Sequence, residues 1–509
     1  MKLQKLTYKK VFNTRDESFS HKVDQCSFHI YKTIRLKLSK VLPLKEHEAY
    51  FLNDQNHDER FSSPMPNGFD YTTSKEVEGF VTLKYVDLFD YLPKEDIDSF
   101  RKQLHHFVKT NKRPSFSPAF FERDEERIIN MGRYFDGYAF ANLCMVEFKH
   151  NSFLSVNDSR VMVSIHNLSS SFALIRYRLY VTKEFSTEIE GCLNKKYAPY
   201  NDVCRQYDTP WYKPWKFGIS CYSGDDARQK AFFSNLYKLI WELYSELKHC
   251  FTVHFSESTL FPPVFFTYST NIRPDSKQFN LDFWKSIGLD SIPDYSQKYN
   301  LCVSSFHDRN NRRGTEMLAL CGGKYTQNDF YPDLAEYHLP DYYCVYMVAN
   351  AIRMVAERDI ANLNIRISRA IRSGKTARLL RVRSAVERKT YYSYRFLQEF
   401  SGDTIDKEAF ADFHNPALKE GSISAKLMLN TPSLLAETKT KIDNILQLLN
   451  DAAEFHLSKS NMALQWAMVI ITILSLLIAG ASLLASYNNF GEAIKSVFKL
   501  FPLVRNSLY

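Results

Sequence analysis

Six basic residues recur at every third position within one stretch of the second half of the chain. They are Arg366, Arg369, Arg372, Lys375, Arg378 and Arg381, called here the basic series. Guanidinium and ammonium groups bind phosphate and other oxyanions, so the series predicts the binding of a small anionic ligand. A solvated helix face that contacts acidic neighbours or lipid headgroups accounts for the same pattern. A three-residue step drifts by about 60° around an α-helix, so we expect the series to spiral around the helix and not to form one stripe.

The basic series has little opposing charge around it. Between Ile360 and Lys389 the only acidic residue is Glu387. Aromatic side chains, on which the bases of single-stranded nucleic acid stack, are absent from the series. Nucleic acid is therefore not an expected partner.

A long uncharged segment follows near the C-terminal end of the sequence. No charged residue occurs between Lys459 and Glu492, and roughly 20 apolar residues suffice to cross the hydrocarbon core of a bilayer. We therefore predict a transmembrane helix over residues 461–487. Its polar side chains recur in an alternating four-three pattern that includes Met468 and Ala479. These polar residues are Asn461, Gln465, Thr472, Ser475, Ser482 and Ser486.

The same period continues upstream, so that one polar seam runs toward the membrane helix. Its upstream members are Glu437, Thr440, Asn444, Gln447, Asp451, Glu454 and Ser458. The apolar residues of this stretch occupy another face: Ile442, Leu446, Leu449, Ala453 and Leu457. Helices that associate in lipid turn polar side chains toward one another or toward water, which favours self-association.

Two interpretations of the seam remain open. It could line a water-filled path in which rings of carboxylates attract cations. The pore-lining residues would then be Glu437, Asp451, Glu454, Asn461, Gln465, Thr472, Ser475 and Ser482. Alternatively, the upstream half is an ordinary solvated face and the membrane half is a tightly packed helix contact.

The elements that must position these residues form an α+β soluble domain followed by long helices. Alternating and periodic apolar residues predict strands over 79–89, 160–167, 171–182, 251–255 and 264–269, and a helix over 225–249. Helices are expected over 342–374 and 376–400, and Thr431 and Pro432 carry the start signals of a last helix. The predicted division is 1–335 (α+β sensing domain), 336–430 (long basic helices), 431–460 (stalk helix), 461–487 (transmembrane helix) and 488–509 (amphipathic or degenerate second membrane segment).

Composition gives the setting. The 509 residues carry a net charge of +9, and the nine cysteines include no C-x-x-C pair, which indicates reduced thiols in the cytosol. Met1 to Asn13 is basic but no apolar stretch follows it, so no signal peptide is expected. The patterns G-x-S-x-G, H-E-x-x-H and D-x-D-x-D-G are absent from the sequence. No enzyme, cofactor or metal site is predicted.

The stalk and membrane helix resemble the C-terminal part of CorA-like proteins. The resemblance lies in Ile442 to Leu457 and then Ala467 to Leu474, and it covers about the last 80 residues. Tyr487-Asn488-Asn489-Phe490 is only a weak match to the family's Tyr-Gly-Met-Asn loop. The segment 491–509 is charged and contains Pro502, so it departs from the family's second membrane helix.

The resemblance implies a pentameric, funnel-shaped homo-oligomer whose first membrane helix lines an ion path, with a divalent cation as the permeant ion. A divergent CorA-like branch, which joins an enlarged soluble domain to such a stalk, acts in antiviral defence and is associated with type III CRISPR loci. For that branch a nucleotide second messenger is implied as the trigger. We therefore expect a ligand-gated effector or channel of the cell (inner) membrane, with its N-terminal domain in the cytoplasm. The alternatives are a non-conducting membrane-anchored scaffold or assembly factor and a membrane-tethered enzyme.

Overall fold

The computed structural model describes a defined part of the chain, which falls into two compact units. Described are residues 30, 33–34, 37–38, 81–111, 141–148, 159–198, 200–205, 217–257, 261–270, 294–296, 301–305, 317–323, 339–400 and 423–505. Residues Met1–Asp359 and Tyr392–Lys439 form the first unit, called here the sheet unit. Ile360–Tyr391 and Thr440–Tyr509 form the second, called the stalk unit.

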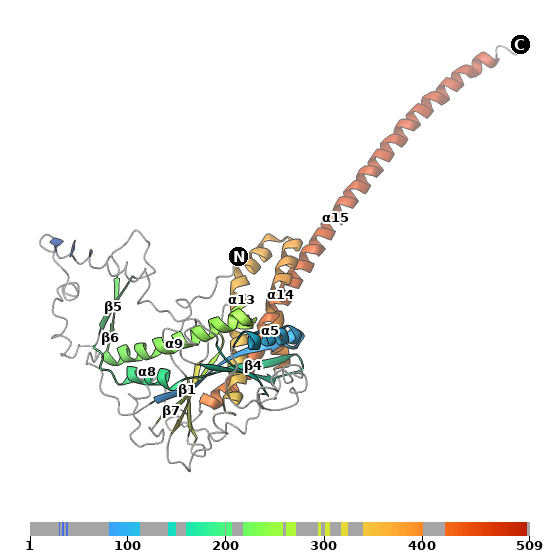
Figure 1. The fold of residues 1–509 in the computed structure, drawn as a ribbon. Coiled ribbons are helices and arrows are strands. Elements are labelled where there is room, and N and C mark those ends of the chain that lie inside the picture. Colours follow the sequence, from blue (N-terminus) through green and yellow to red (C-terminus); the bar gives the residue numbers. More distant parts are fainter. Residues whose placement is uncertain are drawn as a thin grey trace. The chain divides into compact units, whose positions relative to one another are not determined.

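The sheet unit is built on a mostly antiparallel sheet (Figure 1) with the strand order β2-β3-β4-β1-β7-β10-β9-β8. Only the β7–β10 pair is parallel among the described strands. The strands are β1 (Val81–Pro93), β2 (Ala141–Glu147), β3 (Arg160–Asn167), β4 (Phe172–Tyr180), β7 (Val264–Thr270), β8 (Asp294–Ser296), β9 (Leu301–Ser305) and β10 (Met317–Gly323). A separate antiparallel pair consists of β5 (Tyr200–Arg205) and β6 (Phe217–Tyr222).

One face of the sheet is covered by helices that come between the strands in sequence. These are α5 (Ile97–Thr110), which follows the short η1 (Lys94–Asp96), α8 (Lys183–Leu193) and α9 (Gly224–Cys250). The apolar side chains of α5, α8 and α9 form one buried core with alternate residues of β1 and β4, for example Val86, Leu88, Tyr177 and Leu179. The strands predicted over 160–167 and 171–182 and the helix predicted over 225–249 are confirmed, and each end agrees with the prediction within two residues.

The opposite face of the sheet is covered as well. Phe265 of β7 contacts Tyr343 of α13 (Leu339–Ser373), and Phe172 of β4 contacts Phe396 of α14 (Thr376–Glu399). Arg178 lies on this face and is fully buried. Its guanidinium group donates two hydrogen bonds, of 2.7 and 2.8 Å, to the carboxylate of Asp87 on β1, which satisfies both charges away from water.

The strand predicted over 251–255 is wrong. The chain leaves α9 at Cys250, and His254–Glu257 form α10 instead. The cause is Asp90 on β1, whose carboxylate accepts hydrogen bonds from the backbone N–H groups of His254 and Phe255 at 2.8 and 3.4 Å. These N–H groups are thereby taken up by a side chain and not by a neighbouring strand.

The last three long helices contribute to both units. α13 and α14, predicted as 342–374 and 376–400, are confirmed, and they are separated by a turn at Gly374 and Lys375. The start predicted for the last helix at Thr431 is wrong, because α15 (Ile423–Arg505; Figure 1) begins before Thr431. Pro432 therefore lies within the helix. Pro432 is exposed while Thr431 and Leu435 are buried, so packing of the buried face continues the helix through the proline.

In the stalk unit, the three helices share a small apolar core. Leu363, Ile367 and Ala370 of α13 and Leu379 and Val386 of α14 pack around α15. From α15 come Leu449 and Ala453. α13 and α14 therefore form a helical hairpin that lies against one face of α15.

Candidate functional site

One helix among the described residues is long and apolar enough to cross a membrane. It lies within Thr431–Ser482 of α15, and no part of its most apolar window is buried. Residues 461–482 would span about 33 Å, against roughly 30 Å for a hydrocarbon core. A core helix of a soluble protein would hide such residues, but Trp466, Ile470 and Leu477 are each more than half exposed. The C-terminal apolar helix expected from the sequence is confirmed to that extent.

The structure places all eight predicted pore-lining residues on α15, and all eight are exposed. Glu437 belongs to the sheet unit, while Asp451, Glu454, Asn461, Gln465, Thr472, Ser475 and Ser482 belong to the stalk unit. The Thr472 hydroxyl donates a hydrogen bond of 2.8 Å to the carbonyl oxygen of Met468, so this polar group is satisfied within the helix.

In the stalk unit, the seam lies opposite the face that the hairpin covers. Leu449 and Ala453 pack in the core with α13 and α14, and Ile442 is buried, as their predicted apolar face requires. Asp451 and Glu454 are exposed. Leu457 is the exception among the predicted apolar residues, because it is 47% exposed. The intramolecular packing of α15 thus ends just before the uncharged segment begins.

The spacing of the seam has a geometrical consequence. A seven-residue repeat drifts by about 20° per heptad on a straight α-helix. Asp451 and Ser486 are five heptads apart, so the seam turns by about 100° between them. It can face a common axis along this length only if several copies of α15 wind around one another in a left-handed supercoil.

The basic series does not wind around one helix. Arg366, Arg369 and Arg372 lie in the last turns of α13, Lys375 lies in the turn, and Arg378 and Arg381 lie in the first turns of α14. All six are exposed, and the described part of the chain offers none of them an acidic partner. Arg383, two residues beyond Arg381, does pair with Glu387 at 2.9 Å. The six cations are therefore displayed at the end of the α13–α14 hairpin, called here the basic tip.

Two residues that sequence reasoning missed fix the position of the basic tip. Gly374 has a φ of +60°, a backbone conformation that glycine adopts at little cost. A Cβ atom added to Gly374 would lie only 2.7 Å from Cε1 of His456 on α15. The turn therefore lies directly against α15, five residues before Asn461. The glycine is visible in the sequence as a break between helices, but nothing in the sequence indicates its partner.

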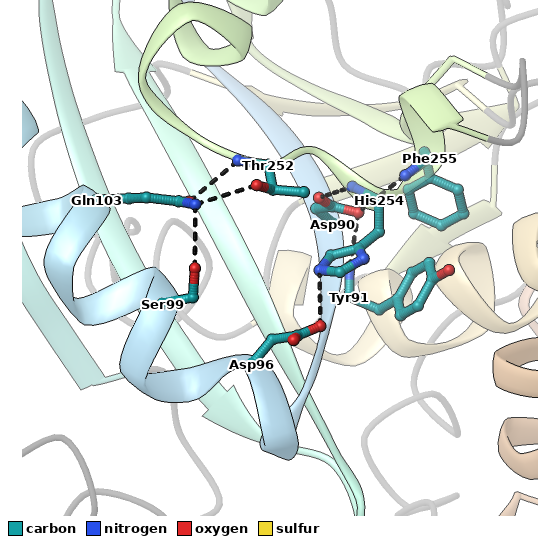
Figure 2. Close-up of polar contacts among 8 residues, drawn as sticks. All are labelled: Asp90, Tyr91, Asp96, Ser99, Gln103, Thr252, His254 and Phe255. Atoms are coloured by element: carbon teal, nitrogen blue, oxygen red, sulfur yellow. Dashed lines mark hydrogen bonds and ion pairs between the residues drawn. The ribbon is translucent and has the colours of Figure 1, made fainter.

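A second polar cluster lies in the sheet unit (Figure 2). The buried Asp90 carboxylate accepts hydrogen bonds from three backbone N–H groups, those of Tyr91, His254 and Phe255. The ring of His254 lies beside that of Tyr91, and its Nε2 is 3.9 Å from Oδ2 of Asp96.

The same region is tied to α5 by an amide side chain (Figure 2). Gln103 donates to the Thr252 hydroxyl and accepts from the Thr252 backbone N–H, both at 3.0 Å. Because the oxygens of Asp90 are occupied by backbone donors and His254 is nearly buried, this cluster holds the segment after α9 in place.

α14 is attached to the sheet through Glu399. Its carboxylate accepts hydrogen bonds from the Ser169 hydroxyl at 2.6 Å and the Ser171 backbone N–H at 3.2 Å, in the β3–β4 turn. Burial raises the pKa of Glu399, but the hydrogen bonds from Ser169 and Ser171 and the charge of Arg395 lower the pKa by more, so that it lies below its usual value. The ionised carboxylate is therefore the form that holds the end of α14 to the sheet.

No protein-family model, curated protein or solved structure matches this chain. Its function must therefore be argued from the site itself. Within the described residues, no group of three or more His, Cys, Asp or Glu side chains is arranged to hold a metal ion. What the described part of the chain offers is an exposed apolar helix with one polar seam, and a cluster of cations at the end of a helical hairpin.

Proposed function

We propose that this chain is a CorA-like membrane effector in which α15 crosses the cell (inner) membrane, associates with copies of itself and lines a path for cations. The sheet unit would lie in the cytoplasm and sense a small anionic signal, such as a nucleotide second messenger produced in antiviral defence. The observation that carries the proposal is the seam on α15. From Asn461 to Ser486 its polar residues recur along one face of an otherwise apolar helix, and the seam is exposed both in the stalk and in the uncharged segment.

The physical reason for self-association is the cost of polar groups in hydrocarbon. An amide side chain without a hydrogen-bond partner costs several kcal/mol in an apolar medium. Asn461 and Gln465 avoid this cost if they face one another or water within an oligomer. A lone anchor helix has no such benefit from placing its polar residues on one face.

The carboxylates explain why cations would be the permeant species. Asp451 and Glu454 are exposed and precede the uncharged segment by less than three turns of α15. In a ring of subunits, these side chains would repeat around the entrance and concentrate cations there. A pentamer, as in the CorA-like proteins, would carry two such rings.

α13 and α14 provide a route for coupling. Each is a single helix with residues in both units, and Glu399 fixes the end of α14 to the β3–β4 turn. A ligand that binds two arrangements of the sheet unit with different affinity would shift the equilibrium between them. Continuous helices can carry that shift to the stalk.

Cysteine substitution in the full-length protein tests the path without knowledge of the ligand. Thr472→Cys and Ser475→Cys should cross-link between subunits or react with water-soluble thiol reagents in the membrane. Ile470→Cys and Leu477→Cys, on the opposite face of the helix, are the matched controls and should do so at least tenfold more slowly. Equal reaction on both faces, with a monomer in mild detergent, would reduce α15 to a simple anchor.

Conduction separates a channel from a scaffold. In liposomes, Thr472→Leu with Ser475→Leu should abolish cation flux while the protein still inserts, because a more apolar seam closes a narrow path by dewetting. Oligomers that cross-link at the seam but conduct no cations, with any nucleotide tested as ligand, would favour the non-conducting scaffold.

A further inference from the structure

We infer that the basic tip binds the anionic phospholipid headgroups of the membrane leaflet that α15 enters. The inference rests on the proposed insertion of α15, but it assigns to the basic series a partner that the sequence left open between a nucleotide and lipid. Three observations carry it: the position of the tip along α15, its exposed and uncompensated charge, and the side of α15 on which it lies.

The position follows from Gly374. The turn lies against His456, and Asn461, where the uncharged segment begins, is five residues or about 7.5 Å further along α15. The headgroup region of a bilayer occupies roughly 5 to 8 Å on each side of the hydrocarbon core. A hairpin that ends at His456 therefore ends at the level of the phosphates when 461–482 spans the core.

The charge is suited to a phosphate layer. The six basic side chains are exposed, and Lys459 of α15 is exposed at the same level. Leu380, in the second turn of α14, is 47% exposed beside them, as in helices that lie at a membrane interface. Lysine and arginine near an anionic lipid surface each contribute about fivefold to binding (about 1 kcal/mol).

A nucleotide site has different requirements from those that the tip meets. Nucleotides bind in concave pockets that bury most of the ligand, with aromatic or apolar side chains against the base. The basic series contains no aromatic residue, and its six side chains are all exposed on two helix ends and the turn between them. Such a shape fits a broad anionic surface better than a single small molecule.

The tip also lies on the lipid side of the proposed oligomer. The hairpin covers the face of α15 that carries Leu449 and Ala453, whereas Asp451 and Glu454 are exposed on the face that would line the path. When the seams meet at an axis, the hairpins lie outside it, above lipid. On the side of the sheet unit, the membrane segment is then flanked by the six cations of the tip and by Lys459, and on the other side by Lys495, Lys499 and Arg505. By the positive-inside rule, this excess of positive charge favours a cytoplasmic sheet unit.

Fluorescence quenching by brominated lipid tests the inference on the full-length protein. Trp466 lies five residues past Asn461, so bromine on nearby acyl chains should quench it, and Trp466→Phe identifies its share of the signal. The protein is placed in vesicles of phosphatidylcholine and phosphatidylglycerol with bromine on one lipid or the other. We expect the quenching of Trp466 by brominated phosphatidylglycerol to indicate that this lipid is enriched about tenfold or more around the wild-type protein, relative to the rest of the bilayer.

Charge reversal provides the matched comparison. Arg372→Glu and Arg378→Glu should each lower the enrichment at least fivefold, and high salt should lower it in the wild type. Arg388→Glu is the control, because this exposed residue on α14 lies about 20 Å from the turn, roughly two Debye lengths. It should leave the enrichment unchanged.

Each outcome of the experiment bears on a different statement. Equal quenching by both brominated lipids, or equal effects of Arg378→Glu and Arg388→Glu, overturns the lipid inference while α15 remains inserted. Absence of quenching by either lipid overturns the insertion on which the proposed function depends. Loss of ATP binding in Arg372→Glu, with lipid enrichment unchanged, would assign the tip to a nucleotide.

Discussion

The turn at Gly374 determines where the basic tip lies, so Gly374→Ala is the sharpest test of the stalk unit. Two effects add. An L-residue at φ +60° costs about 1–2 kcal/mol. The new Cβ would also lie 2.7 Å from Cε1 of His456, which is 0.7 Å short of the 3.4 Å where ordinary contact begins.

The imidazole ring can move aside because Cε1 is at the far end of a half-buried side chain, at a cost of about 0.5–1.5 kcal/mol for an off-rotamer position. Alanine also lowers the conformational entropy of the unfolded chain, which stabilises the folded state by about 0.4–1 kcal/mol. The net expectation for Gly374→Ala is a local destabilisation of about 1–3 kcal/mol.

Amide hydrogen exchange in the full-length protein measures this loss at the ends of α13 and α14, where opening is local. Exchange of these amides should accelerate about fivefold to 150-fold. His456→Ala combined with Gly374→Ala should recover the steric part alone, about 0.5–1.5 kcal/mol. Asparagine, which tolerates the left-handed region, should avoid most of the backbone part but keep the clash.

The double-mutant cycle of Gly374→Ala and His456→Ala can also contradict the contact between these two residues. If Gly374→Ala and His456→Ala act additively within about 0.3 kcal/mol, the two residues do not touch. The turn would then not lie at the level of His456, although the hairpin would still pack on Leu449 and Ala453. In that case the inference that the tip reaches the lipid headgroups would lose its geometrical basis, whatever the exposed charges suggest.

Three further predictions concern the sheet, the end of α14 and the phase of α15. Asp87→Asn should lower the unfolding free energy in urea by about 3–5 kcal/mol because it leaves the buried Arg178 guanidinium uncompensated, whereas Asp87→Leu with Arg178→Met should be nearly neutral. Since the pKa of Glu399 is lowered on folding, the ionised carboxylate stabilises the fold at pH values above the usual pKa of 4.5, and this stabilisation is lost as the pH falls through the lower pKa of the folded state. Glu399→Gln should therefore make the urea midpoint of unfolding depend less on pH in this range. Two alanines inserted between Lys459 and Ser460 rotate the membrane half by about 200°, and four by about 40°. If continuity of the seam governs cation flux, the two-alanine insertion should abolish the flux and the four-alanine insertion should preserve it. Flux that survives two inserted alanines but not four would contradict the pore proposal and favour control by the height of the tip.

The features that were predictable from sequence are those with local causes. α9 was predicted because its apolar residues recur at helical spacing, and other local signals agree: Ser223 and Asp226 exchange hydrogen bonds at its start, and Lys248 and His249 lie near its end. The buried face of α15 was predicted by the period of Ile442, Leu449 and Ala453 for the same reason.

The errors arise where a distant residue decides the local structure. Phe251, Val253 and Phe255 alternate like a strand, but Asp90, which is 164 residues from His254, holds a helical turn there. The basic series was expected to spiral around one helix, but the break at Gly374, which the sequence shows, divides it between α13 and α14. What the sequence does not show is that this turn lies against His456, far along the chain. Ligand binding and conduction are matters of assembly, so they stay predictions at the level of one chain.

One arrangement of α15 connects the seam, the hairpin and the membrane. The hairpin covers one face of α15 as far as His456, and the opposite face carries carboxylates. Past that level no residue of the described chain covers α15, and under the proposed function lipid and other copies of α15 would cover it. The polar face needs partners that offer hydrogen bonds or water, while the apolar faces need only lipid. The oligomer would therefore form through the seam, and the drift of its repeat would then require the helices to supercoil, with the basic tips outside and above the lipid.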